Sequence, residues 1–180
     1  MTDHPSPPTL DPGPFVLCPP DERAPGPRHL ESPHGLGDRL RTAAFAEWQA
    51  ITAFAWAAER FTDAPDGLRH DWRRQVDDEV RHYELIVGRM AELGVDPAAR
   101  PVSDRLWRSL GRCASGRDFC VRIAAAEERG RQAALKLIEY LGDRDPATAA
   151  VFARIAEDEA AHVALPAAYY DLTPDRPEAT

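Results

Sequence analysis

The sequence predicts an all-α fold, a bundle of four long helices arranged as two antiparallel hairpins. Between Asp38 and Asp171, apolar residues recur at the three- and four-residue spacing of helices that bury one face. Breaks rich in Gly, Pro and Asp divide this region into four segments. The first and third breaks are short and the second is long, which favours two hairpins joined by a crossover connection.

The first hairpin is expected to end near Leu93. The break at residues 62–67, Thr-Asp-Ala-Pro-Asp-Gly, separates its two helices, and Gly94 is a typical helix stop. The apolar stripe of the first helix is Leu40, Ala44, Ile51, Phe54, Ala58 and Phe61, and that of the second is Trp72, Val76, Tyr83, Ile86, Met90 and Leu93.

A connection at residues 95–114 follows, with a short helix expected around Asp104–Leu110. The third helix should begin near Ser115, because Ser115 and Asp118 have the spacing of an acidic variant of the capping box. Its stripe is Cys120, Ile123, Gly130, Ala134, Leu137 and Leu141.

The fourth helix should begin at the end of the break at residues 142–146. Asp145 suits the N-cap position and Pro146 the first helical position. Pro166 is expected to weaken or kink the last turns. The stripe of this helix is Phe152, Ile155 and Leu165.

A chain of 180 residues is expected to form one domain. We place the helical bundle at residues 38–171. Residues 1–37 are rich in Pro and Gly without periodicity, which predicts an extended arm or a disordered leader. Residues 172–180 read as a polar C-terminal tail.

A constellation of three chemical groups occurs twice on the helical stripes. Each copy contains a lone Glu and a Glu-x-x-His, and on a helix residues i and i+3 share a face. Residues equally far from a hairpin turn lie side by side, so each lone Glu should lie level with the Glu-x-x-His of its own hairpin. The two copies, 80 positions apart, are Glu47, Glu79 and His82, and Glu127, Glu159 and His162.

These six residues predict a site for two divalent cations. Unpaired carboxylates on an apolar face would be strongly destabilising, so something must neutralise them. Two divalent cations would balance the four glutamates, and neutral histidines would complete the ligand set of a dimetal four-helix bundle. A single Glu-x-x-His would more often reflect chance or a local hydrogen bond; the repeated set is far more specific.

Two further acids immediately precede the ligand glutamates of the Glu-x-x-His pairs. A metal-bound imidazole usually donates its second ring N–H to a carboxylate. We therefore expect Asp78 to support His162 across the bundle and Asp158 to support His82. The alternative is that both are ordinary exposed helix acids.

Eight segments of the sequence carry a resemblance to a known family: Ser32–Gly35, Phe45–Ile51, Asp71–Trp72, Asp77–Tyr83, Ala91–Gly94, Asp104–Trp107, Glu127–Gly130 and Asp158–Ala164. Together they resemble a bacterial ferritin-like family that is catalogued as a domain of unknown function and is similar to the tRNA-hydroxylase branch of ferritin-like di-iron proteins. The resemblance covers roughly residues 30–165 and implies a ferritin-like four-helix bundle with metal ligands at the six positions above. Phe45 stands where relatives often have a histidine.

The composition of the chain restricts the classes of partner, the location and the cysteine chemistry that we expect. The net charge of −8 disfavours nucleic acid, and the sequence has no apolar run long enough for a membrane helix. The N-terminus does not resemble a signal peptide, so a cytoplasmic location is expected. The three cysteines lack a Cys-x-x-Cys motif, which disfavours a disulfide framework or thiolate metal site.

The function expected from these residues is that of a non-haem dimetal oxidase or oxygenase, with two iron ions, or manganese or a mixed pair, and dioxygen as co-substrate. Glu79 and Glu159 would bridge the metals. The expected partners are a small-molecule substrate, an electron-donor protein and a second copy of the chain. The alternatives are a ferroxidase or iron-handling protein, a tRNA hydroxylase and a non-catalytic metal-binding bundle. Ile51, Phe54 and Gly130 are candidates for lining a substrate pocket.

Overall fold

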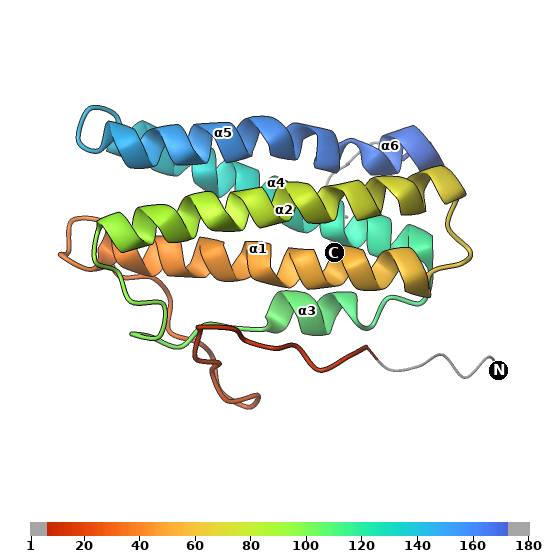
Figure 1. Cartoon of the computed structure of the whole chain (residues 1–180), viewed down its shortest axis with the longest axis horizontal. Coiled ribbons are helices and arrows are strands. Elements are labelled where there is room, and N and C mark those ends of the chain that lie inside the picture. The colour runs from red at the N-terminus through yellow and green to blue at the C-terminus, as the bar shows by residue number, and fades with distance from the viewer. Residues whose placement is uncertain (1–6, 173–180) are drawn as a thin grey trace, which may run out of the picture.

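The structure, a computed structural model, describes residues 7–172 and confirms an all-helical fold for them. Four long helices lie side by side along the molecule (Figure 1). The helices of the described residues are α1 (Gly35–Arg60), α2 (Asp66–Glu92), α3 (Arg105–Leu110), α4 (Gly116–Leu141), α5 (Pro146–Val163) and α6 (Leu165–Tyr170). None of these helices is both long and apolar enough to cross a membrane.

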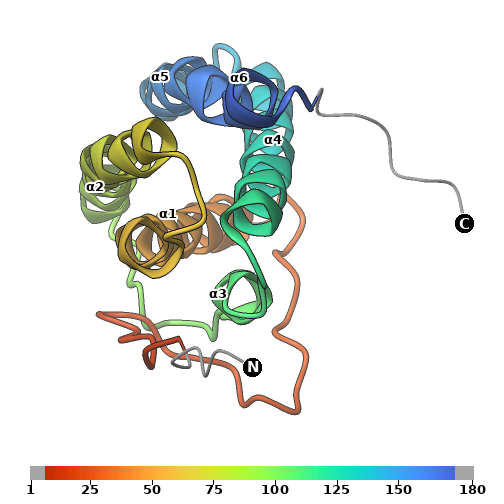
Figure 2. The same cartoon turned by 90° about the vertical axis from the view of Figure 1, so that its right-hand side faces the viewer.

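The four long helices form a bundle of two hairpins. Viewed from one end, α1, α2, α5 and α4 surround a common interior, and α3 lies outside the bundle below α1 and α4 (Figure 2). Packing is extensive between α1 and α2 and between α4 and α5, whereas α1 and α4 touch at few points. The bundle is therefore less tightly packed on the side between α1 and α4, where a cavity lies.

The helix ends largely follow the sequence signals. The Ser115 side chain accepts a hydrogen bond from Asp118 N at 3.1 Å, and Asp145 accepts one from Thr148 N at 3.1 Å. The reciprocal bond of the capping box is shifted by one residue, because the Asp118 carboxylate accepts from Ala114 N at 3.2 Å. Gly94 has φ of +64°, a left-handed conformation that suits glycine after α2.

The end of the second hairpin is a break rather than a gentle kink. Helix α5 ends at Val163, and α6 begins at Leu165 with Pro166 in its first turn. The Tyr169 hydroxyl donates a hydrogen bond to Asp71 Oδ2 at 2.6 Å, which ties α6 to α2. The predicted tail lies outside the described residues except for Leu172.

The core contains most of the predicted apolar stripes. Its largest fully buried side chains include Trp72, Phe54, Phe61 and Phe119. Leu93 is an exception: it is 40% exposed, because it follows the last turn of α2. The stripe prediction was therefore wrong at this position.

Residues 7–34 form an extended arm against the bundle. Phe15 is buried, and Trp48 Nε1 donates to Asp11 O at 2.7 Å. Val102 in the crossover exchanges backbone hydrogen bonds of 2.9 Å with Val16 O and Cys18 N. Tertiary contacts thus hold a segment that has no periodicity of its own.

The start of α1 is anchored by a buried ion cluster. The first helix begins at Gly35, three residues before the expected start, and places Asp38 inside the cluster. The Asp38 side chain is 3% exposed and accepts from Arg28 Nε at 2.7 Å, Arg41 at 3.0 Å and Arg100 at 2.6 Å. Hydrogen bonding to Arg28, only partly offset by burial, holds the pKa of Asp38 well below its usual range.

Candidate metal centre

The structure brings the sequence-predicted ligands together from four helices near the middle of the bundle. Glu79, His82, Glu159 and His162 are buried, with exposed fractions of 0 to 4%, and the Glu47 side chain is 13% exposed. Helical spacing explains the placement, since each Glu-x-x-His presents both groups on one face. The contributions are Glu47 from α1, Glu79 and His82 from α2, Glu127 from α4, and Glu159 and His162 from α5.

The carboxylates of Glu79 and Glu159 lie between the two imidazoles. His82 Nδ1 is 3.3 Å from Glu159 Oε1 and 3.7 Å from Glu79 Oε2. His162 Nδ1 is 3.0 Å from Glu79 Oε1 and 3.4 Å from Glu159 Oε2. Each carboxylate therefore turns one oxygen toward each histidine, a placement that suits a ligand shared by two cations.

The two lone glutamates lie at the edge of this arrangement. Glu47 Oε2 is 4.0 Å from His82 Nδ1. Together with Glu79 and Glu159, these residues offer four ligand atoms within 4.8 Å of one another, enough to hold a metal ion. Glu127 lies beside Glu159, on the side of the cluster facing α4.

The donor atoms of the centre lack hydrogen-bond partners within the described part of the chain. This holds for both carboxylate oxygens of Glu79 and of Glu159 and for Nδ1 of both histidines, and all six atoms are buried. The short contacts between them therefore lack hydrogen-bond geometry. Buried polar atoms left unsatisfied cost about 1–3 kcal/mol each, and more when charged, so this cluster is not a self-sufficient core. The donor set fits divalent cations.

The electrostatics of the ligands support the same interpretation. Burial and the charge of Glu79 raise the pKa of Glu47 and of Glu127 well above the usual range. Burial lowers the pKa of His82, but contacts with Glu159 and Glu79 outweigh it and raise the value to about 9. For His162, contacts with Glu159 and Glu79 also outweigh burial and raise the pKa to about 10. Protons on these four groups would carry as much positive charge as two divalent cations.

The outer nitrogens of the histidines contact the two expected aspartates. His162 Nε2 is 3.3 Å from Asp78 Oδ2, and His82 Nε2 is 3.4 Å from Asp158 Oδ2. An imidazole that donates from Nε2 keeps Nδ1 deprotonated and free to bind a metal. Both contacts cross between α2 and α5, in the pairing expected from the sequence.

Arginines hold the two aspartates, which the sequence interpretation missed. Arg81 pairs with Asp78, and Arg154 Nε lies 3.2 Å from Asp158 Oδ2. The signal was available, since these pairs have the i,i+3 and i,i+4 spacing of helix ion pairs. Burial raises the pKa of Asp78, but hydrogen bonds from Arg81 and His162 lower it overall.

We predict that Asp78→Ala and Asp158→Ala each weaken metal affinity about 10–100-fold, because each imidazole loses the carboxylate that orients it. Competition with a chromophoric chelator measures the effect. Asp77→Ala is the matched control, because Asp77 is exposed on the same helix as Asp78. Unchanged metal retention in both variants would contradict the assigned role.

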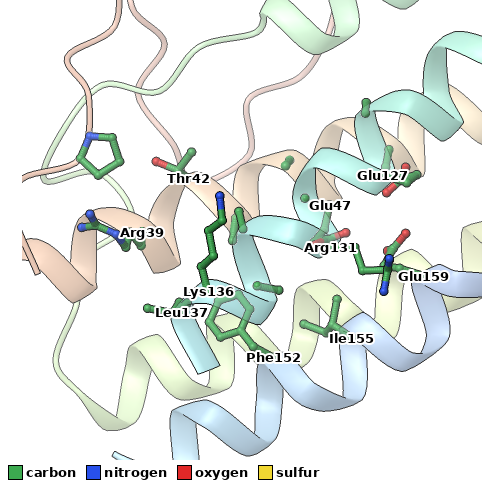
Figure 3. A pocket seen from close by; sticks show the side chains of 18 of the residues that line it. Arg39, Thr42, Glu47, Glu127, Arg131, Lys136, Leu137, Phe152, Ile155 and Glu159 are labelled. Atoms are coloured by element: carbon green, nitrogen blue, oxygen red, sulfur yellow. The ribbon is translucent and has the colours of Figure 1, made fainter. Parts of the chain in front are cut away.

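A cavity of about 540 Å³ opens between α1 and α4 and reaches the ligand cluster. Figure 3 shows Glu47, Glu127 and Glu159 at one end of it. Gly130 lines the cavity as expected. The expectation for Ile51 and Phe54 was wrong: neither belongs to the lining, and Phe54 instead packs edge-on against His162 with ring centroids 6.1 Å apart.

Comparison with known proteins gives a family but no activity. No curated protein and no solved structure matches the chain. A family model described as "Protein of unknown function (DUF455)" matches residues 3–178. Because this match spans nearly the whole chain, the protein belongs to the DUF455 family.

Proposed function

We propose that this protein is a ferritin-like, non-haem dimetal oxidase or oxygenase that uses dioxygen to oxidise a small molecule. The observation that carries the proposal is the set of buried, unpartnered donor atoms between α2 and α5. A bundle of two hairpins with a crossover, each hairpin supplying a Glu and a Glu-x-x-His, has the ligand arrangement of ferritin-like dimetal proteins.

The position of each ligand residue would determine its role in binding the two cations. Glu79 and Glu159, which lie between the imidazoles, would bridge the cations. His82 and Glu47 would complete one end and His162 and Glu127 the other. A bound pair of iron ions, or of manganese or one of each, supplies the site for reducing dioxygen.

The cavity favours a small-molecule substrate over iron in transit to a mineral core and over a tRNA. It is largely lined by Ala, Leu, Phe and Ile side chains, and it ends at Glu47, Glu127 and Glu159. Hydrated iron in transit to a mineral core would not need an apolar chamber. A tRNA substrate is disfavoured by the net charge of −8.

The first functional test is oxygen uptake after anaerobic loading with iron(II). We expect rapid consumption by the wild-type protein and loss of it in Glu159→Ala, because that variant lacks a bridging carboxylate. Glu157→Ala is the control, since this glutamate is exposed on the same helix. Wild-type uptake no faster than that of free iron(II) would contradict the proposal.

The mass of the native assembly distinguishes an oxidase from an iron-storage protein. A monomer or dimer that consumes oxygen without retaining a ferric mineral is the expected result. A large closed assembly that accumulates many iron atoms per chain would instead favour the ferroxidase function.

A further inference from the structure

The cavity between α1 and α4 has a cationic end opposite its acidic end. Arg39 and Lys136 lie at this end with Thr42, away from the glutamates (Figure 3). Lys136 is the only lysine in a chain with a net charge of −8. The antiparallel course of α1 and α4 explains the arrangement, because the start of α1 lies beside the end of α4 (Figure 1).

These two cations are available to a ligand. Within residues 7–172 neither side chain pairs with a carboxylate, and Arg39 uses one nitrogen to donate to Arg28 O and Gly35 O. Arg131, the third cation of the cavity, differs, because its Nε is 2.7 Å from Glu128 Oε2. The positive charge at the outer end thus comes from Arg39 and Lys136.

The wall between the two ends is apolar and partly lined by small side chains. On α1 and α4 it consists mainly of alanines, and Leu137, Phe152 and Ile155 close the inner side. Arg39 and Glu47 are eight residues apart on α1, a rise of about 12 Å along the helix. An extended alkyl chain of on the order of ten carbons spans this distance, given C–C bonds of about 1.5 Å.

Gly130 widens the cavity near its acidic end. A Cβ placed on Gly130 would meet no atom within 4 Å, so the space beside it is open. Gly130 lies one turn from Glu127 on α4 and lines the cavity. A larger side chain here would occupy the place that the far end of a ligand needs.

We propose that the cavity binds an amphiphile with an anionic head, a carboxylate or a phosphate, and a single medium-length apolar chain. Arg39 and Lys136 bind the head, the apolar wall holds the chain, and the far end of the chain reaches the glutamates. That this molecule is the one oxidised rests on the proposed function; that it binds does not.

The test compares three probes with equal chains: decanoate, decyl phosphate and decanol. Calorimetry on the purified protein under nitrogen should show tighter binding of at least one anion than of the alcohol. The double variant Arg39→Gln/Lys136→Met should weaken anion binding about 10–100-fold, through lost charge-assisted hydrogen bonds, and leave decanol unchanged. Arg129→Gln is the control, because Arg129 is exposed on α4 and lies outside the cavity.

Two glycine variants test separately where the bound amphiphile lies in the cavity. Gly130→Leu should weaken binding of the preferred anion, and Gly88→Leu should not, although both replace an open, helical glycine. Both changes should raise helix stability by about 0.5–1 kcal/mol, so misfolding does not confuse the result. The preference between decanoate and decyl phosphate identifies the head group.

Decanol binding as tightly as both anions, an unaffected double variant or an unaffected Gly130→Leu would each overturn the proposal. Metal content measured on the same samples keeps the two hypotheses apart. Anion binding by protein that holds no metal would contradict the proposed oxidase function and support the amphiphile site. Two metals without anion binding would do the reverse.

Discussion

Glu79→Ala is expected to abolish metal binding, because Glu79 turns one oxygen toward each histidine and its loss removes a ligand from both cations at once. Wild-type protein should gain about 2.7 kcal/mol of stability at a metal concentration one hundred times the dissociation constant. The variant should show no such gain. Thermal unfolding with and without manganese(II) or anaerobic iron(II) measures it.

Two further variants show whether a loss of metal binding in Glu79→Ala comes from the lost ligand or from misfolding. Glu79→Gln keeps the side-chain volume but removes the charge and replaces one carboxylate oxygen with an amide nitrogen, so it should fold and still fail to hold two metals. Glu84→Ala should behave as wild type, because Glu84 is exposed on the same helix. Retention of two metals in both Glu79 variants would contradict the bridging role.

Asp38→Asn should be strongly destabilising, although Asp38 lies outside the metal centre. It leaves Arg41, whose side chain is 5% exposed, without its buried carboxylate. Breaking a buried ion pair costs about 3–5 kcal/mol. For a domain of this size that lowers the melting temperature by about 6–20 °C. Asp21→Asn, which changes an exposed acid on the arm, should have little effect.

The pH dependence gives this prediction a second readout. The folded pKa of Asp38 is depressed, so its contribution to stability is complete above the unfolded pKa of about 4 and is lost as pH falls toward the folded value. Urea unfolding should therefore show the gap between wild type and Asp38→Asn narrowing below about pH 4. A gap that stays constant there would contradict the ion-cluster account.

The arrangement of the candidate site was predictable because helix geometry determines it. Three-residue spacing places each Glu and His on one face, and the equal offsets from a hairpin turn bring each lone Glu level with the Glu-x-x-His of its own hairpin. The contacts of Asp78 with His162 and of Asp158 with His82 join the two hairpins, in the pairing predicted from the repeated motif and from the usual partner of a metal-bound imidazole. No knowledge of individual side-chain contacts was needed for these features.

The arm and the cavity depend on distances between elements, which periodicity does not encode. Asp38 joins Arg28 on the arm to Arg100 in the crossover. Arg100 is 62 positions from Asp38, and nothing local marks that pairing. Ile51 was misplaced for a related reason. Ala46 and Ala50 line the cavity with Glu47, so the cavity follows one side of Glu47 around α1, whereas Ile51 lies on the other side.

The most direct test of the central claim is elemental analysis of wild-type protein purified without added metal. We predict about two iron or manganese atoms per chain, the number that the paired ligand set accommodates. Protein that binds no transition metal, even after anaerobic loading with iron(II), would contradict the dimetal centre and with it the proposed oxidase.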